Sequence, residues 1–103
     1  MHYPYNNKKE VLKTDKANGN LLASTNSNDI VELFIDHDGL IPAHALPIDV
    51  TFYVIKGSGA ITIDNETIAA RQGDVIEVKR GLERSWHNQS TESLKLLVIK
   101  QKQ

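Results

Sequence analysis

The sequence of 103 residues contains no cysteine. This absence excludes disulfides, zinc sites built on thiolates and a cysteine nucleophile. An excess of basic residues is missing as well: 12 Lys and Arg stand against 13 Asp and Glu, which gives a formal net charge of -1. Because a domain that binds duplex nucleic acid normally carries a basic surplus, we do not expect a nucleic-acid partner.

Long hydrophobic runs are absent too. The longest uninterrupted aliphatic or aromatic runs, 52–55 and 96–99, are four residues each. A membrane-spanning helix needs about 20 such residues. Residues 1–10 have no apolar run behind their lysines, so they do not resemble a secretory signal. We therefore expect a cytoplasmic protein with no membrane partner.

The residues that are present suit a small globular domain. Hydrophobic residues make up 40% of the chain and charged residues 24%, which is an ordinary balance for a folded protein. A chain of this length forms one core and hides about 60–70% of the surface that it exposes when unfolded. We expect a single domain at 20–103, preceded by a polar arm at 1–19 that lies on the surface or on a partner subunit.

Short stretches of β-branched and aromatic residues recur between turn residues, and no stretch repeats with a clean helical period. We predict strands at 30–36, 51–56, 60–63, 67–70, 75–78, 85–88 and 94–100. Pro42 and Pro47 each remove a backbone donor, so the segment between them is expected at a sheet edge. Many short strands at a spacing of roughly 8–12 residues predict an all-β sandwich or small barrel.

The stretch from Gly39 to Asn88 resembles the two motifs of the cupin family. The first motif, G-x5-H-x-H-x3,4-E-x6-G, is matched in order by Gly39, His44, Leu46, Val50 and Gly57. The second, G-x5-P-x-G-x2-H-x3-N, is matched without gaps by Gly73, Lys79, Gly81, Arg84 and Asn88. The resemblance implies a jelly-roll barrel, also called a double-stranded β-helix. It also implies a homodimer, because small cupins commonly pair.

The departures from these motifs fall on the metal ligands of the family. In metal-binding cupins the two histidines and the glutamate of the first motif, with the histidine of the second, hold the ion. Of these positions only His44 keeps its ligand here, since Leu46 and Val50 carry no donor atom and Arg84 is a permanent cation. A catalytic transition metal usually needs at least three protein ligands. We therefore expect a degenerate metal site, no metal and no cofactor.

Strand alternation indicates which side chains share the barrel interior. If His44 faces inward, as its family position implies, the expected ligand-binding residues are His44, Leu46, Val50, Phe52, Val54, Arg84 and Trp86. These residues predict a pocket with apolar walls and a few polar groups, which suits a small molecule. The forked donors of Arg84 would bind a carboxylate or phosphate in place of the metal.

Several alternatives stay open at this stage. Arg84 can instead pair with an internal carboxylate such as Glu32 or Asp49, or reach the barrel mouth into water. His44 and Trp86 can be plain packing residues. The protein can be a metal-independent isomerase or epimerase that uses His44 as base, or an oxygenase with an unusual ligand set. A non-catalytic, dimeric interaction module with a filled barrel is the remaining hypothesis.

Overall fold

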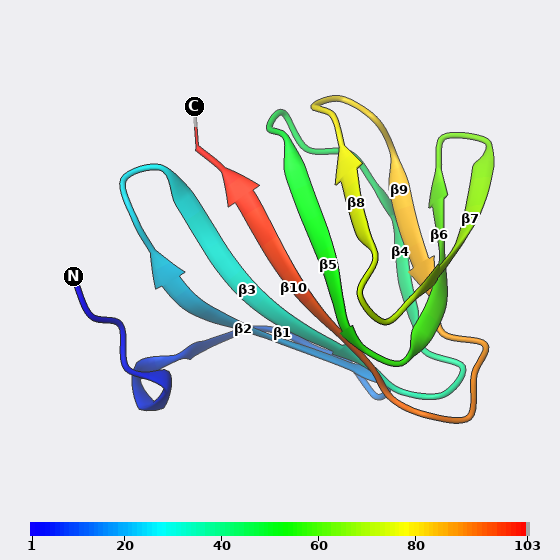
Figure 1. The fold of residues 1–103 in the computed structure, drawn as a ribbon, viewed down its shortest axis with the longest axis horizontal. Coiled ribbons are helices and arrows are strands. Elements are labelled where there is room, and N and C mark those ends of the chain that lie inside the picture. The colour runs from blue at the N-terminus through cyan, green and yellow to red at the C-terminus, as the bar shows by residue number, and fades with distance from the viewer. Residues whose placement is uncertain (103) are drawn as a thin grey trace.

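Antiparallel strands joined by short turns make up the computed structural model, which describes residues 1–102 (Figure 1). A short 3-10 helix, η1 (Tyr5–Asn7), comes before the strands. The strands are β1 (Lys9–Lys13), β2 (Ala17–Ser24), β3 (Asn28–Ile35), β4 (Leu40–His44), β5 (Val50–Lys56), β6 (Ser58–Ile63), β7 (Glu66–Arg71), β8 (Val75–Val78), β9 (Arg84–His87) and β10 (Leu94–Gln101). No helix in the described range is long and apolar enough to cross a membrane.

Two sheets face each other. The larger has the strand order β1-β2-β3-β10-β5-β8, and the smaller has the order β4-β9-β6-β7. Neighbours in each sheet are antiparallel, and strands distant in the sequence lie side by side, as β3 and β10 do (Figure 1). This arrangement confirms the predicted all-β jelly roll. All seven predicted strands are present as β3 and β5 to β10, with ends within two residues of those expected. β4 lies at a sheet edge, as its prolines indicated.

The N-terminal residues pair into the larger sheet. β1 forms its outer edge and is hydrogen-bonded to β2, which in turn pairs with β3. The expected boundary between an arm at 1–19 and a barrel at 20–103 falls inside β2. Strand β2 reads Ala-Asn-Gly-Asn-Leu-Leu-Ala-Ser, and asparagine and glycine are depleted in strands, so its composition gave no signal.

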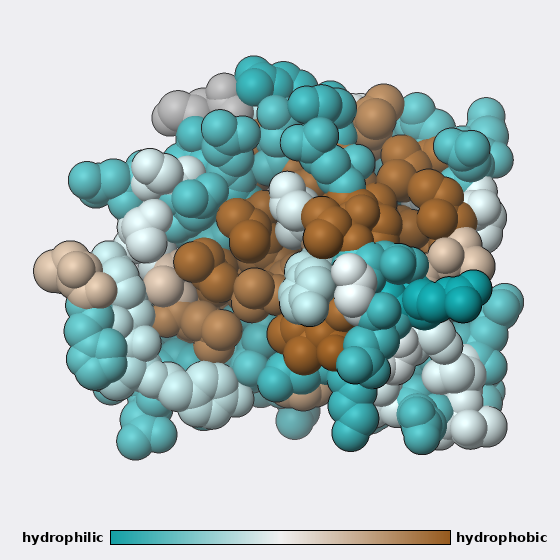
Figure 2. All heavy atoms as spheres, viewed as in Figure 1, coloured by the Kyte–Doolittle hydropathy of each residue, from teal (hydrophilic) through white to brown (hydrophobic). Residues whose placement is uncertain are grey.

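The core lies between the two sheets, because alternation buries one face of each strand. On β5, Val50, Phe52 and Val54 are buried, whereas Tyr53 between them is 39% exposed. On β9, Arg84 and Trp86 are buried. These directions are those that the sequence predicted. Hydrophobic side chains also gather across the middle of the face in Figure 2, with hydrophilic ones around them.

One end of the barrel is closed by hydrogen bonds around Asn88, which is fully buried. Its side-chain amide donates to the carbonyl oxygens of Ile35 (2.8 Å) and Glu92 (2.7 Å), and its Oδ1 accepts from the Ser90 backbone N–H at 3.0 Å. Its backbone N–H donates to the carbonyl of Gly39 at 3.0 Å. A Cβ at position 39 would lie 2.7 Å from the carbonyl oxygen of Lys16, so this close approach requires glycine.

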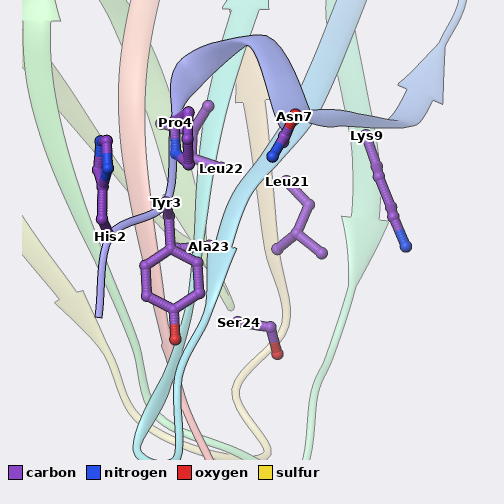
Figure 3. A pocket seen from close by; sticks show the side chains of 9 residues that line it. All are labelled: His2, Tyr3, Pro4, Asn7, Lys9, Leu21, Leu22, Ala23 and Ser24. Atoms are coloured by element: carbon purple, nitrogen blue, oxygen red, sulfur yellow. The ribbon is translucent and has the colours of Figure 1, made fainter.

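The N-terminal segment folds back over the larger sheet. The Tyr5 hydroxyl donates to Glu32 Oε2 at 2.6 Å, and Asn20 Nδ2 donates to the same oxygen at 3.1 Å. The hydrogen bond to Glu32 raises the pKa of Tyr5 above its usual 10.0. Figure 3 shows the groove that this segment forms with β2, lined among others by Tyr3, Pro4 and Leu22. These contacts give the buried Glu32 carboxylate its partners on the side of the sheet away from the core.

An ion pair and hydrogen bonds connect the β2–β3 turn to the residue that follows β10. Lys102 Nζ lies 3.5 Å from Asp29 Oδ1 and donates to the Ser24 hydroxyl at 2.8 Å. The Ser24 hydroxyl donates to Asp29 Oδ1 at 2.6 Å. This hydrogen bond, helped by the charge of Lys102, lowers the pKa of Asp29 below its usual 3.8. The three side chains therefore join two chain segments at the end of the barrel opposite Asn88.

Asp29→Asn should make the unfolding free energy less dependent on pH under acidic conditions. The pKa of Asp29 is lower in the folded state than in the unfolded state. Its contribution to the unfolding free energy is therefore present in full above the unfolded-state pKa of 3.8, and it is lost as the pH falls through the folded-state pKa. The unfolding free energy of the native protein should fall more steeply below about pH 4 than that of the variant. Urea unfolding at a series of pH values measures both slopes. Ser24→Ala should act in the same direction, and equal slopes in all three proteins would contradict this account.

Candidate functional site

A cavity of about 250 Å³ opens between the two sheets, toward the end where β4 leads into β5. Most of its wall is aliphatic or aromatic. Its lining residues are Val11, Leu12, Gly19, Val31, Leu33, Ile41, His44, Leu46, Val50, Phe52, Arg84, Trp86, Val98 and Lys100. Seven of the ten strands contribute, so the site is assembled from most of the chain. An apolar hollow with a few convergent polar groups is the usual form of a small-molecule site.

The structure brings six of the seven sequence-predicted site residues to this cavity: His44, Leu46, Val50, Phe52, Arg84 and Trp86. Val54 does not line it. Its side chain is fully buried in the core beyond Phe52, because β5 runs inward from Val50 toward the closed end. That the lining residues bind a ligand stays a prediction at this point.

Arg84 is the most unusual residue of the site. It begins β9 and is buried on the same face of that strand as Trp86, so its side chain is directed into the barrel. Only 2% of the residue is exposed, and neither its Nε nor its Nη2 has a hydrogen-bond partner among residues 1–102. Desolvation by burial lowers the pKa of the guanidinium below its usual value. Because an arginine remains protonated in proteins, the cavity contains a buried positive charge.

The carboxylates that could have neutralised Arg84 are engaged elsewhere. Glu32 accepts from Tyr5 and Asn20 on the other face of β3. Asp49 accepts from the backbone N–H of Arg80 at 2.8 Å and lies 3.5 Å from its Nε. No salt bridge joins Arg84 to a carboxylate within residues 1–102. The alternative of an internal ion pair with Glu32 or Asp49 is therefore wrong for this structure.

Trp86 lies one layer deeper than Arg84 on the same face of β9. Its ring packs edge to face against the ring of Phe52, which lies on the opposite sheet. The two ring centroids are 5.4 Å apart, and the angle between the ring planes is 70°. Such aromatic pairs add to the stability that burial alone gives. Yet the indole Nε1–H, although buried, has no acceptor in the described part of the chain. Trp86 is thus a packing residue that also leaves one donor unused.

His44 lies at the rim of the cavity, on the edge strand β4 and opposite Arg84 in the register. The residue is exposed. Its Nδ1 lies 3.1 Å from the carbonyl oxygen of Pro42. Since a carbonyl only accepts, Nδ1 carries the proton in this contact and Nε2 is left for another partner.

Lys100 is a site residue that the sequence reasoning missed. It lies on β10 directly opposite Val50 of β5 and Asp29 of β3, and it lines the cavity. The signal was available, because Leu94, Leu96 and Val98 alternate inward along the same strand and Lys100 continues that series. The residues that β1 and β2 add to the wall carried no such signal.

The comparisons with known proteins decide the family. The family model described as "Cupin domain" matches residues 35–100, which is well over half of the chain. The chain belongs to the cupin family. No curated protein matches it by sequence.

Solved structures share the fold of this cupin at low sequence identity. A conserved protein of unknown function from Streptococcus pyogenes is 23% identical over 88% of this chain and 78% of its own, with a TM-score of 0.76. A predicted oxalate decarboxylase from Thermotoga maritima is 13% identical over the full length of both chains, with a TM-score of 0.85. The polyketide cyclase RemF from Streptomyces resistomycificus is 15% identical over 98% of this chain and 78% of its own, with a TM-score of 0.78. At these identities the likeness extends to the fold alone.

The residues at the metal positions of the family do not fit a metal ion. Of the four positions only His44 offers a ligand, while Leu46 and Val50 present methyl groups and Arg84 presents a positive charge that repels a cation. Across the described residues there is no group of three or more His, Asp or Glu side chains that could hold a metal. We derive no step through a metal ion from this donor set.

Chelator treatment should therefore leave the thermal stability of this cupin unchanged. One imidazole beside a guanidinium gives too few donors for tight binding, so metal in protein purified without chelators should lie well below one ion per chain. Elemental analysis measures the metal content, and thermal unfolding with and without EDTA measures its effect. Stoichiometric iron, manganese, nickel or zinc that is lost in His44→Ala would contradict the prediction.

Proposed function

We propose that this cupin binds a small anionic molecule in its barrel cavity through Arg84. The single observation that carries the proposal is a buried guanidinium with two unpartnered nitrogens that lines an apolar cavity. An unpaired charge in a low-dielectric interior is unfavourable unless an opposite charge joins it. An anion in the cavity supplies that charge and accepts hydrogen bonds from the free N–H groups.

The shape of the cavity supports a small ligand. Its volume of about 250 Å³ lies just below the range of roughly 300–1,000 Å³ for pockets that hold drug-sized molecules. The wall opposite Arg84 is formed by Val50 and Phe52, and neither adds a polar group. A carrier, sensor or storage role follows from binding of this kind without any reaction.

An acid–base enzyme finds less support. A pair of groups with separate acid and base roles should face the substrate. The ionisable side chains along the cavity wall in the described part of the chain are His44, Arg84 and Lys100. Arg84 and Lys100 are both cationic, and no carboxylate or phenol stands opposite His44. The isomerase alternative therefore has a candidate base without a matching acid.

We also propose that this cupin forms a homodimer through the outer face of the larger sheet. Tyr53 on β5 and Val75 on β8 are directly opposite one another there, with exposures of 39% and 64%. Leu97 of β10 lies beside Tyr53 on the same face. A self-complementary apolar patch of this kind suits two-fold pairing with a second copy. The membership of the cupin family supports the same assembly.

Arg84→Met should stabilise the ligand-free protein and strongly weaken anion binding. Replacing buried ionic groups by apolar ones often raises the unfolding free energy by about 1–4 kcal/mol, and here the charge has no internal partner to lose. Urea unfolding measures this gain. Thermal shifts with acetate, benzoate, succinate and phenyl phosphate measure binding, since a ligand selective for the native state raises the melting temperature. Truncating one member of a buried charge pair should weaken binding by about 30-fold or more.

The matched control is Arg71→Met, at an exposed arginine on β7 outside the cavity. It should neither gain stability nor lose any binding. The proposal fails if every anion that binds the native protein binds Arg84→Met equally well, or if none of the panel binds the native protein.

Val75→Lys should shift the protein from dimer to monomer, because it places a charge within the proposed apolar interface, beside Tyr53. Sedimentation velocity over a range of concentrations measures the association state. Leu40→Lys is the control: Leu40 is 56% exposed but lies on β4 of the other sheet, so this variant should remain dimeric. A native protein that is monomeric at all concentrations would exclude the dimer.

A further inference from the structure

The polar lining of the cavity consists almost entirely of donors. An arginine, a lysine and a tryptophan side chain each donate hydrogen bonds and accept none. Arg84 Nε, Arg84 Nη2 and Trp86 Nε1 are all buried without an acceptor, and the wall includes no Asp, Glu, Asn, Gln, Ser or Thr within residues 1–102. A buried donor without an acceptor is costly. The ligand head that suits this lining brings acceptors and no donors of its own.

An ionised carboxylate meets that requirement, since its two oxygens only accept. An alcohol or an amide brings its own N–H or O–H, and the only side-chain atom of the described wall that can accept it is Nε2 of His44 at the exposed rim. The planar fork of Arg84 also matches the geometry of a carboxylate. The chemistry of the lining therefore separates a carboxylate from its neutral analogues.

The local charge favours a single negative charge. Arg84 has no counter-ion in the described structure. Lys100, in contrast, lies opposite Asp29 in the register, and its positive charge contributes to the lowered pKa of that carboxyl. Asp29 also lies 3.5 Å from Lys102 Nζ, so it offsets Lys100 only in part. Lys100 is half-buried at the mouth of the cavity, where solvent screens its charge, and Arg84 is the buried positive charge of the described wall. A dianion would bring a second negative charge into an apolar cavity without a partner, which is unfavourable.

The polar and apolar parts of the cavity are arranged in layers. Arg84 and His44 are register partners at the end of the barrel where β4 leads into β5, and Val50 and Lys100 are partners at the same end. One layer further in, Phe52 is paired with Val98 and contacts Trp86. A ligand whose polar head group lies beside Arg84 would therefore place a compact apolar body against the aromatic layer of Phe52 and Trp86.

We infer that the ligand is a monocarboxylate with a compact apolar body, whose carboxylate is bound jointly by the guanidinium of Arg84 and the indole N–H of Trp86. This inference rests on the proposed function, and it adds the charge of the ligand, the nature of its body and a second binding residue. Trp86 acts as a hydrogen-bond donor to the ligand in addition to its packing against Phe52.

Trp86 is the only tryptophan of the chain, so its fluorescence reports on this cavity alone. Titrations with benzoate, its neutral analogue benzamide, the dianion phthalate and phenyl phosphate test the ligand class. Benzoate should bind about tenfold or more tightly than each of the others, because it alone satisfies the donors without excess charge or added N–H groups.

Trp86→Phe tests the second donor. It removes the indole N–H and keeps an aromatic ring, so benzoate binding measured by calorimetry should weaken by about tenfold, the size of one charge-assisted hydrogen bond. Toluene, which has no acceptor, should bind both proteins within a factor of about three. The matched control is Phe52→Leu, which alters the same aromatic pair but keeps the N–H and should keep the native ratio of benzoate to toluene affinity.

The outcomes separate this inference from the proposed function. If benzoate, phthalate and phenyl phosphate all bind and all depend on Arg84, but bind with equal affinity, the function stands and the monocarboxylate class is wrong. If Trp86→Phe keeps the native benzoate-to-toluene ratio, the indole N–H does not bind the carboxylate. If no anion binds, or Arg84→Met changes nothing, the proposed function itself fails.

Discussion

A positive charge enclosed in an apolar barrel without a counter-ion is the constraint around which this site is built. Arg84 occupies the start of β9 and alternates with Ser85, so it shares the inward, buried face of that strand with Trp86. The carboxylates Glu32 and Asp49 are held by other partners. Because removal of an ion from water is expensive, the protein tolerates this arrangement only at a cost to its own stability. Under the proposed function, an anionic ligand would offset that cost on binding.

Arg84, Trp86 and Asn88 lie in one inward-facing row along β9 and the residue after it, and they differ in how far their polar groups are hydrogen-bonded. At the closed end, both side-chain groups of Asn88 are hydrogen-bonded, and these bonds fix the chain segments around Ile35 and Glu92. Trp86 packs well but leaves its N–H without an acceptor, and Arg84 leaves two nitrogens without one. Hydrogen-bond satisfaction therefore decreases from the closed end toward the mouth. Protein interiors rarely contain hydrogen-bond donors without acceptors. The presence of three such donors at one cavity therefore supports the proposal that a ligand binds there.

Much of this architecture could be predicted from local sequence. Alternation and turn residues located β3 and β5 to β10, and the spacing from Gly39 to Asn88 identified the inward positions on β5 and β9. Strands β1 and β2 escaped prediction because their polar, asparagine- and glycine-containing sequences become strands only by pairing with β3. That Arg84 lacks a partner could not be predicted either. It depends on where Glu32 and Asp49 point, and only the tertiary fold fixes that.

The substitutions at the former metal positions are chemically linked to one another. In the motif that this cupin resembles, a glutamate stands where Val50 stands and a histidine stands where Arg84 stands. Val50 lines the same end of the cavity as Arg84. A carboxylate at position 50 would offer an internal counter-ion to the guanidinium, and that pair would satisfy itself and leave no charge for a ligand. An arginine at position 84 can therefore serve a ligand only when the glutamate is absent. Under the proposed function, the aliphatic side chain of Val50 is thus a condition for anion binding by Arg84 as well as a departure from the metal-binding motif.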